Sequence, residues 1–278
     1  KSFKSFSPII CFSTKSNSNL EILKEIKRNG LGADVVSKGE LMIALKAGIS
    51  SKKIVFSGVG KTRSELIYAI EKNILLINCE SKSEILEIER IAKLKKKKVD
   101  IGIRLNPNTD AKTLKQISTG KKENKFGINE KTFIEVSRYI KASKFLNLKC
   151  LSVHIGSQIL DHKPYQKMIN VLDKLIKKMD FSFEYIDLGG GMGIDYKKDN
   201  KKFDFKKYNQ IIKKFLVNHK SKIIFEPGRS IIGNTAILVS KILYIKENSK
   251  KDFIILDAAM NDFMRPALYG AKHKIIPL

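Results

Sequence analysis

The sequence predicts an α/β protein: a (β/α)8 barrel followed by the start of a β-rich domain. Two observations predict the barrel. Short β-branched apolar runs alternate with amphipathic helical stretches, and eight such units within about 225 residues match a barrel of this kind in number and length. Continuous apolar runs separated by helices also indicate parallel strands that are buried on both faces. An open doubly wound sheet is the alternative, which is weakened because no GxGxxG motif follows the first strand.

Eight apolar runs are the expected strands, in the order Ile9–Thr14, Ala33–Val36, Lys53–Ser57, Ile74–Asn78, Val99–Leu105, Leu148–Ile155, Tyr185–Leu188 and Lys222–Phe225. Between them, apolar residues recur at the i, i+3, i+4 spacing of amphipathic helices, as in 20–28, 39–47, 63–72, 83–93 and 165–179. We therefore expect the barrel to occupy residues 1–228.

The pattern changes after Arg229. Residues 231–248 and 251–260 are typical of two longer strands joined by a turn at Glu247–Asp252, with no helix between them. We expect residues 229–278 to be the incomplete start of a C-terminal β domain. The chain does not begin with Met and ends just after a strand-like run, so we expect a fragment of a longer protein.

The formal net charge of +26 raises the alternative of a basic nucleic-acid-binding protein. Seven of the 54 basic residues are Arg and 47 are Lys, whereas bidentate phosphate and base recognition favours Arg. The densest lysine run, 93–98, follows a helical stretch, where lysine complements the helix dipole. We expect no nucleic-acid partner. No apolar run approaches the roughly 20 residues of a membrane helix, so we expect no membrane span.

The three cysteines, Cys11, Cys79 and Cys150, lie in apolar strand-like runs, and no CxxC motif occurs. Three cysteines cannot form a disulfide framework, and their spacing does not suit a metal site. We expect buried, reduced thiols in a cytoplasmic protein, with no bound metal.

Polar residues follow several expected strands at the end where barrel enzymes place their chemistry. Glycines 189–191 follow the seventh strand and Gly228-Arg229 follow the eighth, and loops at these two places commonly bind phosphate in barrels. Glu226 ends a buried apolar run. It could belong to a structural salt bridge, or it could hold a proton on the ring nitrogen of a cofactor.

Lys15 and His154 also end apolar runs. Burial there would lower the pKa of Lys15 and supply a neutral amine for a Schiff base, whereas the alternative is a lysine that reaches into solvent. His154 is either a hydrogen-bonded core residue or a ring that stacks on a planar cofactor. An amine, two phosphate loops, a carboxylate and a stacking histidine together indicate a pyridoxal 5'-phosphate site.

Seven segments, in order along nearly the whole chain, resemble the diaminopimelate decarboxylase family of barrel-type pyridoxal phosphate enzymes. They read ICFSTKSNSNL, GADVVSKGEL, RLNPNTDAKTLKQISTGKKENKFGI, LSVHIGSQI, IDLGGGMGI, FEPGRSI and DAAMNDFMRPALYGAKH. The third and the last are specific to the diaminopimelate branch. Thr14 and Ser16 flank Lys15, where the family usually has a small hydrophobic pair.

The resemblance implies a role for each matching residue. Lys15 would bind the cofactor covalently, His154 would stack on its ring, and Glu226 would pair with its pyridine nitrogen. The other implied cofactor-binding residues are Asp34, Arg104, Ser157, Gly189, Gly190, Gly191, Pro227, Gly228 and Arg229. Those implied to bind the carboxylates of an amino-acid substrate are Arg229, Arg265 and Tyr269.

The activity implied is decarboxylation of meso-2,6-diaminopimelate to L-lysine and CO2, the last step of lysine biosynthesis, by a homodimer with a shared active site. Family members also have an N-terminal segment and a C-terminal continuation, which carries a tyrosine near the cofactor and a cysteine that acts as proton donor. Three alternatives stay open. One is a related decarboxylase for ornithine, arginine or carboxynorspermidine, whose substrate would favour an acidic distal pocket over Arg265. The others are a racemase of the same barrel class, and a fragment without activity.

Overall fold

The computed structural model describes residues 2–111, 119–120, 123–179, 181–196 and 202–278. The chain divides into two compact units. The first comprises Lys1–Ile194 and Lys202–Gly233, and the second comprises Asp195–Lys201 and Asn234–Leu278. The residues that follow position 228 thus group with the first unit as far as Gly233. The domain boundary that we expect after residue 228 stays a prediction.

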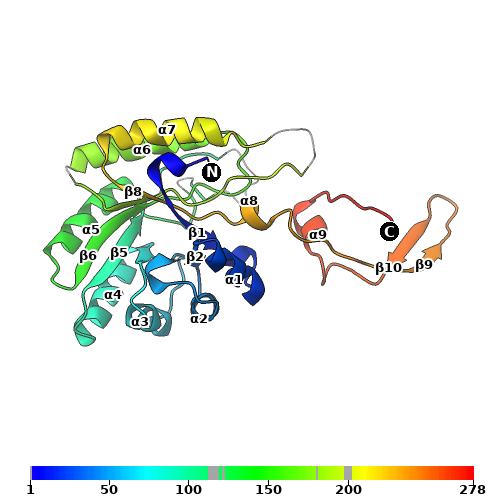
Figure 1. Ribbon diagram of the computed structural model, residues 1–278, viewed down its shortest axis with the longest axis horizontal. Helices are drawn as coiled ribbons and strands as arrows, with labels where there is room; N and C mark the ends of the chain where they lie inside the picture. Colours follow the sequence, from blue (N-terminus) through cyan, green and yellow to red (C-terminus); the bar gives the residue numbers. More distant parts are fainter. Residues whose placement is uncertain (1, 112–118, 121–122, 180, 197–201) are drawn as a thin grey trace. The chain divides into compact units, whose positions relative to one another are not determined.

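The first unit is a closed barrel of eight parallel strands, which confirms the predicted (β/α)8 fold (Figure 1). The strands pair in sequence order, and β1 closes the barrel against β8. Their bounds are β1 Ile9–Ser13, β2 Gly32–Val35, β3 Ile54–Phe56, β4 Leu76–Cys79, β5 Val99–Arg104, β6 Leu146–Ser152, β7 Tyr185–Asp187 and β8 Lys222–Phe225.

Helices follow the strands and lie outside them (Figure 1). Their bounds are α1 Leu20–Arg28, α2 Lys38–Lys46, α3 Arg63–Glu71, α4 Lys82–Leu94, α5 Glu130–Ala142, α6 Lys163–Met179, α7 Phe205–Asn218 and α8 Arg229–Ile232, with short 3-10 helices at Lys4–Phe6, Thr14–Ser16 and Ser51–Lys53. Helices α2, α3 and α4 begin alike, since a Ser or Thr side chain accepts a hydrogen bond from the backbone of a glutamate three residues on. These caps fix the loops that leave the carboxyl ends of the strands.

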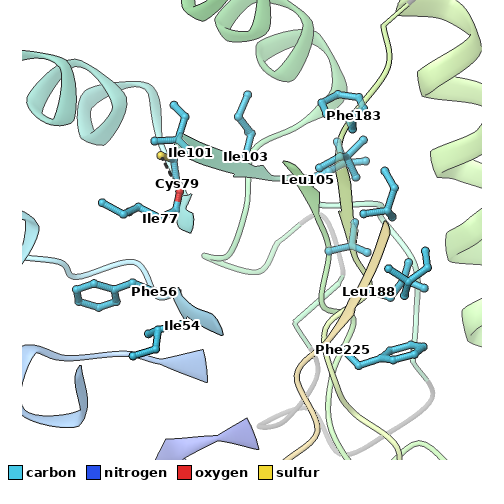
Figure 2. Close-up of a cluster of buried hydrophobic side chains, with 14 of the residues drawn as sticks. Ile54, Phe56, Ile77, Cys79, Ile101, Ile103, Leu105, Phe183, Leu188 and Phe225 are labelled. Atoms are coloured by element: carbon cyan, nitrogen blue, oxygen red, sulfur yellow. Dashed lines mark hydrogen bonds between the residues drawn. The ribbon is translucent and has the colours of Figure 1, made fainter. Parts of the chain in front are cut away.

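The main hydrophobic core lies between the strands and the helices. Figure 2 shows part of it, including Phe56 from β3, Ile77 from β4, Ile101 and Ile103 from β5, and Phe225 from β8. A second, smaller cluster comes from the alternate strand positions and consists of Cys11, Val55, Leu76, Cys150 and Ile224. Because strand side chains alternate between faces, residues two positions further along share the face of this cluster. Those residues are Ser13, Ser57, Asn78, Ser152 and Glu226, so a polar layer lies above an apolar one inside the barrel.

Gly32 at the start of β2 makes a backbone approach that only glycine allows. A Cβ there would lie 2.0 Å from the backbone oxygen of Lys53. We expect Gly32→Ala to destabilise the protein by about 3 kcal/mol, because β2 and the start of β3 would have to separate to make room for the Cβ. Gly39 in α2 is the matched control, since a Cβ there would meet nothing closer than 3.8 Å. Gly39→Ala should be neutral or stabilising by up to about 1 kcal/mol in urea unfolding. Equal effects of the two substitutions would contradict this packing.

The second unit contains an antiparallel pair, β9 (Ile242–Lys246) and β10 (Phe253–Leu256), and the short helix α9 (Arg265–Tyr269). The turn expected at residues 247–252 lies between the two strands. The prediction of a long strand from residue 231 was wrong. The amide of Gly233 bonds to the oxygen of Arg229, which closes a helical turn, and the ladder to β10 begins only at Ile242.

Within the described ranges, no helix is both long and apolar enough to cross a bilayer. The three cysteines are buried and unpaired, as the sequence analysis expects.

Candidate active site

A cavity of about 460 Å³ opens among the loops that follow the barrel strands. Its volume lies within the range of small-molecule sites, which is roughly 300–1,000 Å³. The lining residues are Lys15, Val36, Ser57, Gly58, Val59, Gly60, Arg104, Thr119, Phe126, Ser152, His154, Ser157 and Glu226. Five residues that the sequence singled out therefore meet in one cavity: Lys15, Arg104, His154, Ser157 and Glu226.

Lys15 lies just beyond β1 and pairs with Asp34 of β2. The Lys15 Nζ donates to Asp34 Oδ2 at 3.1 Å, and the Ser13 hydroxyl donates to the same oxygen at 2.8 Å. Burial acts to lower the pKa of Lys15, but the Asp34 and Glu226 carboxyls outweigh it and hold that pKa above its ordinary value. The sequence-based expectation of a lowered pKa was therefore wrong for the free protein. A lysine that ends a buried strand is here charged and paired, because the register of β1 and β2 sets Ser13 beside Asp34.

Glu226 directly follows β8 and lies near Asp187, the last residue of β7. The Ser57 hydroxyl donates to Glu226 Oε1 at 3.2 Å. Burial raises the pKa of Glu226 well above its usual range, and the Asp187 and Asp34 charges raise it further. A carboxyl in this setting can hold a proton or stabilise a cation beside it.

His154 follows β6 and is neutral. Burial lowers the pKa of its ring well below 6.5, and the Arg104 and Lys15 charges act in the same direction. The amide of Gly190 donates to His154 Nδ1 at 3.2 Å. Since Nδ1 accepts this bond, the ring proton resides on Nε2.

The glycine loop after β7 fits closely against its neighbours. A Cβ on Gly190 would lie 2.1 Å from the backbone oxygen of Glu226, and Gly191 has a φ of +91°, in the region that favours glycine. After β8, a Cβ on Gly228 would meet Ser13 and Ser16 at 3.1 Å, and the oxygen of Pro227 accepts the amide of Ser13 at 3.0 Å. The loop after β7 thus packs against the end of β8, and the loop after β8 packs against the end of β1.

Gln158, to which the sequence analysis assigned no role, orients Arg229. Its Oε1 accepts from Arg229 Nη1 at 3.2 Å, and its Nε2 donates to the backbone oxygen of Ile194 at 2.6 Å. Its backbone φ of +62° is unusual for a residue with a side chain, and such strain concentrates at functional sites. The motif HIGSQI contains Gln158, but only the fold reveals what it contacts.

Glu80 is a second residue that the sequence reasoning left without a role. Its Oε1 accepts from Arg104 Nη1 at 2.7 Å, and its Oε2 accepts from the amide of Gly127 at 2.7 Å. The Arg104 guanidinium also lies 4.9 Å from the ring centre of Phe126, which lines the cavity. Glu80 therefore fixes the position of Arg104, which lines the cavity, and of the loop at Gly127.

We expect Glu80→Gln to destabilise the protein by about 3–5 kcal/mol, because the buried Arg104 loses its counter-charge. The exposed pair Lys82–Glu135 is the matched control, with side chains 54% and 58% exposed. Glu135→Gln should change the unfolding free energy by less than about 1 kcal/mol. Chemical denaturation of the two variants checks this difference, and a cost for Glu80→Gln no larger than the control would contradict it.

The other predicted site residues are placed as follows. Asp34 and Gly190 do not line the cavity but contact lining residues, Lys15 and His154. Pro227, Gly228 and Arg229 lie in the segment after β8, and Gly189 and Gly191 lie in the glycine loop with Gly190; none of these five is a lining residue. Arg265 and Tyr269 lie on α9 in the second unit, where the Arg265 guanidinium is 5.9 Å from the Tyr269 ring centre. Their contact with a substrate stays a prediction. Of the third segment of the resemblance, residues 112–118 and 121–122 lie outside the described residues.

The residues present suit pyridoxal phosphate. Asp34 Oδ1 is buried and has no hydrogen-bond partner in the described part of the chain, so the carboxyl that binds Lys15 keeps an unsatisfied acceptor beside the cavity-lining lysine. An amine, a carboxyl and a neutral imidazole line the cavity, and glycine-rich loops follow β7 and β8 next to His154 and Glu226.

A family model for the pyridoxal binding domain of pyridoxal-dependent decarboxylases matches residues 1–233. The chain therefore belongs to the pyridoxal-dependent decarboxylase family. Within it, the chain is 43% identical to diaminopimelate decarboxylase from Aquifex aeolicus over 97% of its length, and 45% identical to that from Helicobacter pylori over 99%. The crystal structure of the Helicobacter pylori enzyme complexed with L-lysine superposes with a TM-score of 0.94 at 44% identity, over 98% of this chain and 69% of that one.

The chain spans about two thirds of these relatives, covering 65% of the Aquifex aeolicus protein and 68% of the Helicobacter pylori protein. A structure of diaminopimelate decarboxylase from M. jannaschii also matches, with a TM-score of 0.87 and 36% identity over 96% of this chain. These matches support the resemblance on which the sequence analysis relies.

Proposed function

We propose that this protein decarboxylates meso-2,6-diaminopimelate to L-lysine and CO2 with pyridoxal phosphate as cofactor. The observation that carries the proposal is the meeting of Lys15, His154 and Glu226 in one cavity of a chain that belongs to the pyridoxal-dependent decarboxylases. The substrate follows from relatives named diaminopimelate decarboxylase, at 39–45% identity over nearly the whole chain.

Each residue has a proposed task. Lys15 binds the cofactor through its amine, and Asp34 holds that amine in place. Glu226 keeps a proton on the pyridine nitrogen, and the neutral ring of His154 packs on the face of the cofactor. Bound pyridoxal phosphate supplies an electron sink when the bond to the substrate carboxylate breaks. Ser157, Gly191, Gly228 and Arg229 bind the phosphate through backbone amides and one guanidinium. Gly189 and Gly190 shape the loop instead, because their amides are bonded to Asp187 and His154.

The substrate has two amino-acid ends, and Arg229, Arg265 and Tyr269 are the proposed contacts of its carboxylates. A site that reads the distal end with fixed charge rejects analogues that leave its polar groups unpaired. Ornithine and arginine lack the second carboxylate. We further propose that the protein works in the cytoplasm as a homodimer. The buried, unpaired thiols support the cytoplasm, and the homodimer rests on the family resemblance alone.

The test uses the protein at the length in which the cell makes it. We would load it with pyridoxal phosphate, reduce it with borohydride and map the modified lysine by peptide mass spectrometry. We would then measure CO2 release from meso-diaminopimelate, ornithine and arginine. Label at Lys15 and release from meso-diaminopimelate alone are the expected results. If Lys15 is labelled but CO2 is released from ornithine or arginine, the proposed cofactor site stands and the proposed substrate is wrong. If the label is scattered over many lysines of a folded protein, both the proposed cofactor site and the proposed substrate are wrong.

A further inference from the structure

Two buried carboxyls lie side by side at the ends of β7 and β8. Asp187 is fully buried and Glu226 is 8% exposed. Asn78 and Ser57 link them, since Asn78 Nδ2 donates to Asp187 Oδ2 at 2.8 Å and to the Ser57 hydroxyl at 3.3 Å, and that hydroxyl donates to Glu226 Oε1 at 3.2 Å. Like charges on two neighbouring buried carboxyls oppose each other, so one of the two keeps a proton. The proposed function uses Glu226 but gives no task to Asp187. Two questions follow: which of the two carboxyls holds the proton, and what that proton does in the site.

The hydrogen-bond donors around the pair decide which carboxyl holds the charge. Asp187 Oδ1 accepts from the amide of Gly189 at 2.9 Å. Asp187 Oδ2 accepts from Asn78 Nδ2 at 2.8 Å and from the Ser152 hydroxyl at 3.3 Å. Three donors converge on one carboxyl, and donors favour the ionised form.

Glu226 has fewer donors. Among the described residues, its side-chain oxygens accept from the Ser57 hydroxyl at 3.2 Å. The Asn78 amide, which could otherwise compensate Glu226, is turned to Asp187. Its Oδ1 faces Gly102, where a Cβ would lie only 2.2 Å away. Gly102 thus makes room for the orientation of Asn78 that places its donor on Asp187.

Other charges around the pair agree with this assignment. Burial raises the pKa of Glu226, and the neighbouring Asp187 and Asp34 raise it further, while the Lys15 ammonium opposes the shift and is bound to Asp34. Burial and the Asp34 charge also raise the pKa of Asp187, but the Gly189 and Asn78 donors oppose that shift, whereas among the described residues no such set of donors opposes it at Glu226. Burial raises the pKa of Cys11, Cys150 and Tyr208 as well, so these three neighbours of Asp187 are neutral at pH 7.

We propose that Asp187 is a positioning residue that keeps one proton on Glu226 in the cofactor-free site, ready for the pyridine nitrogen of pyridoxal phosphate. The role toward the cofactor rests on the proposed function, whereas the proton on Glu226 does not. When the ring enters, the O–H bond of Glu226 breaks and an N–H bond forms at the ring nitrogen. Glu226 becomes the carboxylate that stabilises the charged ring, and Asp187 stays ionised against its three donors, so no outside proton is needed.

The same residue reaches the phosphate side of the site. By accepting the amide of Gly189, Asp187 Oδ1 fixes the start of the glycine loop, whose next amide holds His154. The Asp187 carboxylate thus has two tasks in this proposal. It keeps the proton on Glu226 that the ring nitrogen receives, and it fixes the start of the glycine loop.

The first test is infrared spectroscopy of the cofactor-free protein at pH 7.5, where a protonated buried carboxyl gives a C=O band apart from those of carboxylates. We expect such a band to shift when glutamate is labelled with ¹³C and not when aspartate is, and to vanish in Glu226→Gln. Ser152→Ala is the matched control, because it removes one donor to Asp187 and leaves both carboxyls, so the band should stay. A band that follows aspartate labelling, or no protonated band in the wild type, would overturn the proposal.

The second test follows protons during cofactor binding. Titration of pyridoxal phosphate by calorimetry, in two buffers that differ in ionisation enthalpy, counts the protons exchanged. In Asp187→Asn, Glu226 loses the Asp187 charge but stays buried near Asp34, so a larger fraction of Glu226 should be ionised before binding than in the wild type. That variant should therefore draw more protons from the buffer than the wild type or Ser152→Ala, up to about one per site. An equal proton count in all three would overturn the transfer. Absence of binding in the wild type would instead count against the proposed function and leave the infrared result standing.

Discussion

Lys15→Ala should lose decarboxylase activity by about 10⁴-fold or more, because the substitution removes the amine that binds the cofactor, and no other lysine of the described residues lines the cavity. Borohydride reduction after incubation with pyridoxal phosphate should then leave no dominant labelled peptide. The measurement is turnover of meso-diaminopimelate together with peptide mapping.

Lys24 on α1 is the matched control for this experiment. It pairs with Glu21 on the same helix, away from the cavity lining. Lys24→Ala should keep both activity and the label at Lys15, which separates specific labelling from reaction with the other lysines of the chain. Persistent activity in Lys15→Ala would show that a different amine carries the cofactor.

The loss in Lys15→Ala should not come from unfolding. Asp34 would lose its cation but keep the hydrogen bond from Ser13. Because the Lys15 side chain is 52% exposed, the pair is screened by solvent, and we expect a cost of about 1–3 kcal/mol instead of the 3–5 of a fully buried pair. Circular dichroism and urea unfolding of the cofactor-free variant check this.

The barrel strands were predictable because their apolar runs are short, β-branched and separated by helical periods. Each of the eight expected runs overlaps a strand of the barrel. The polar layer inside the barrel was also within reach of the sequence. Cys11 and Ser13, or Leu76 and Asn78, are two residues apart on one strand, so period-two spacing puts an apolar and a polar residue on the same face. Interpreting the strands only as continuous apolar runs hid that alternation.

Other features depend on contacts that no local pattern contains. The charged state of Lys15 follows from the alignment of β1 with β2, which sets Asp34 beside it. The role of Glu80 depends on a loop amide 47 positions away, at Gly127. The short helix α8 was read as strand because Ile231 and Ile232 are β-branched, whereas the turn after Gly228 decides their conformation. For Lys15 and Glu80, contacts between residues distant in sequence decide the outcome. For α8, tertiary context overrides the β propensity of the two isoleucines.

Glu226→Gln should lower decarboxylase activity by about 10²–10⁴-fold while pyridoxal phosphate still binds. An amide can hydrogen-bond to the ring nitrogen but cannot balance a positive charge there, so the ring becomes a weaker electron sink. The phosphate loops are untouched, and the label at Lys15 should persist. A variant with full activity would show that the ring nitrogen does not need a carboxylate.

The same substitution should change how stability depends on pH. The folded pKa of Glu226 is raised above the unfolded value of about 4.3, so the folded state binds more protons between those two pKa values. This group therefore stabilises the wild type fully below pH 4.3, and its contribution is lost as pH rises toward the folded pKa. Glu226→Gln lacks that dependence, so its unfolding free energy relative to the wild type should rise with pH across this window. Urea unfolding of both cofactor-free proteins at several pH values measures the difference, and parallel pH profiles would mean that Glu226 ionises in the fold as readily as in the unfolded chain.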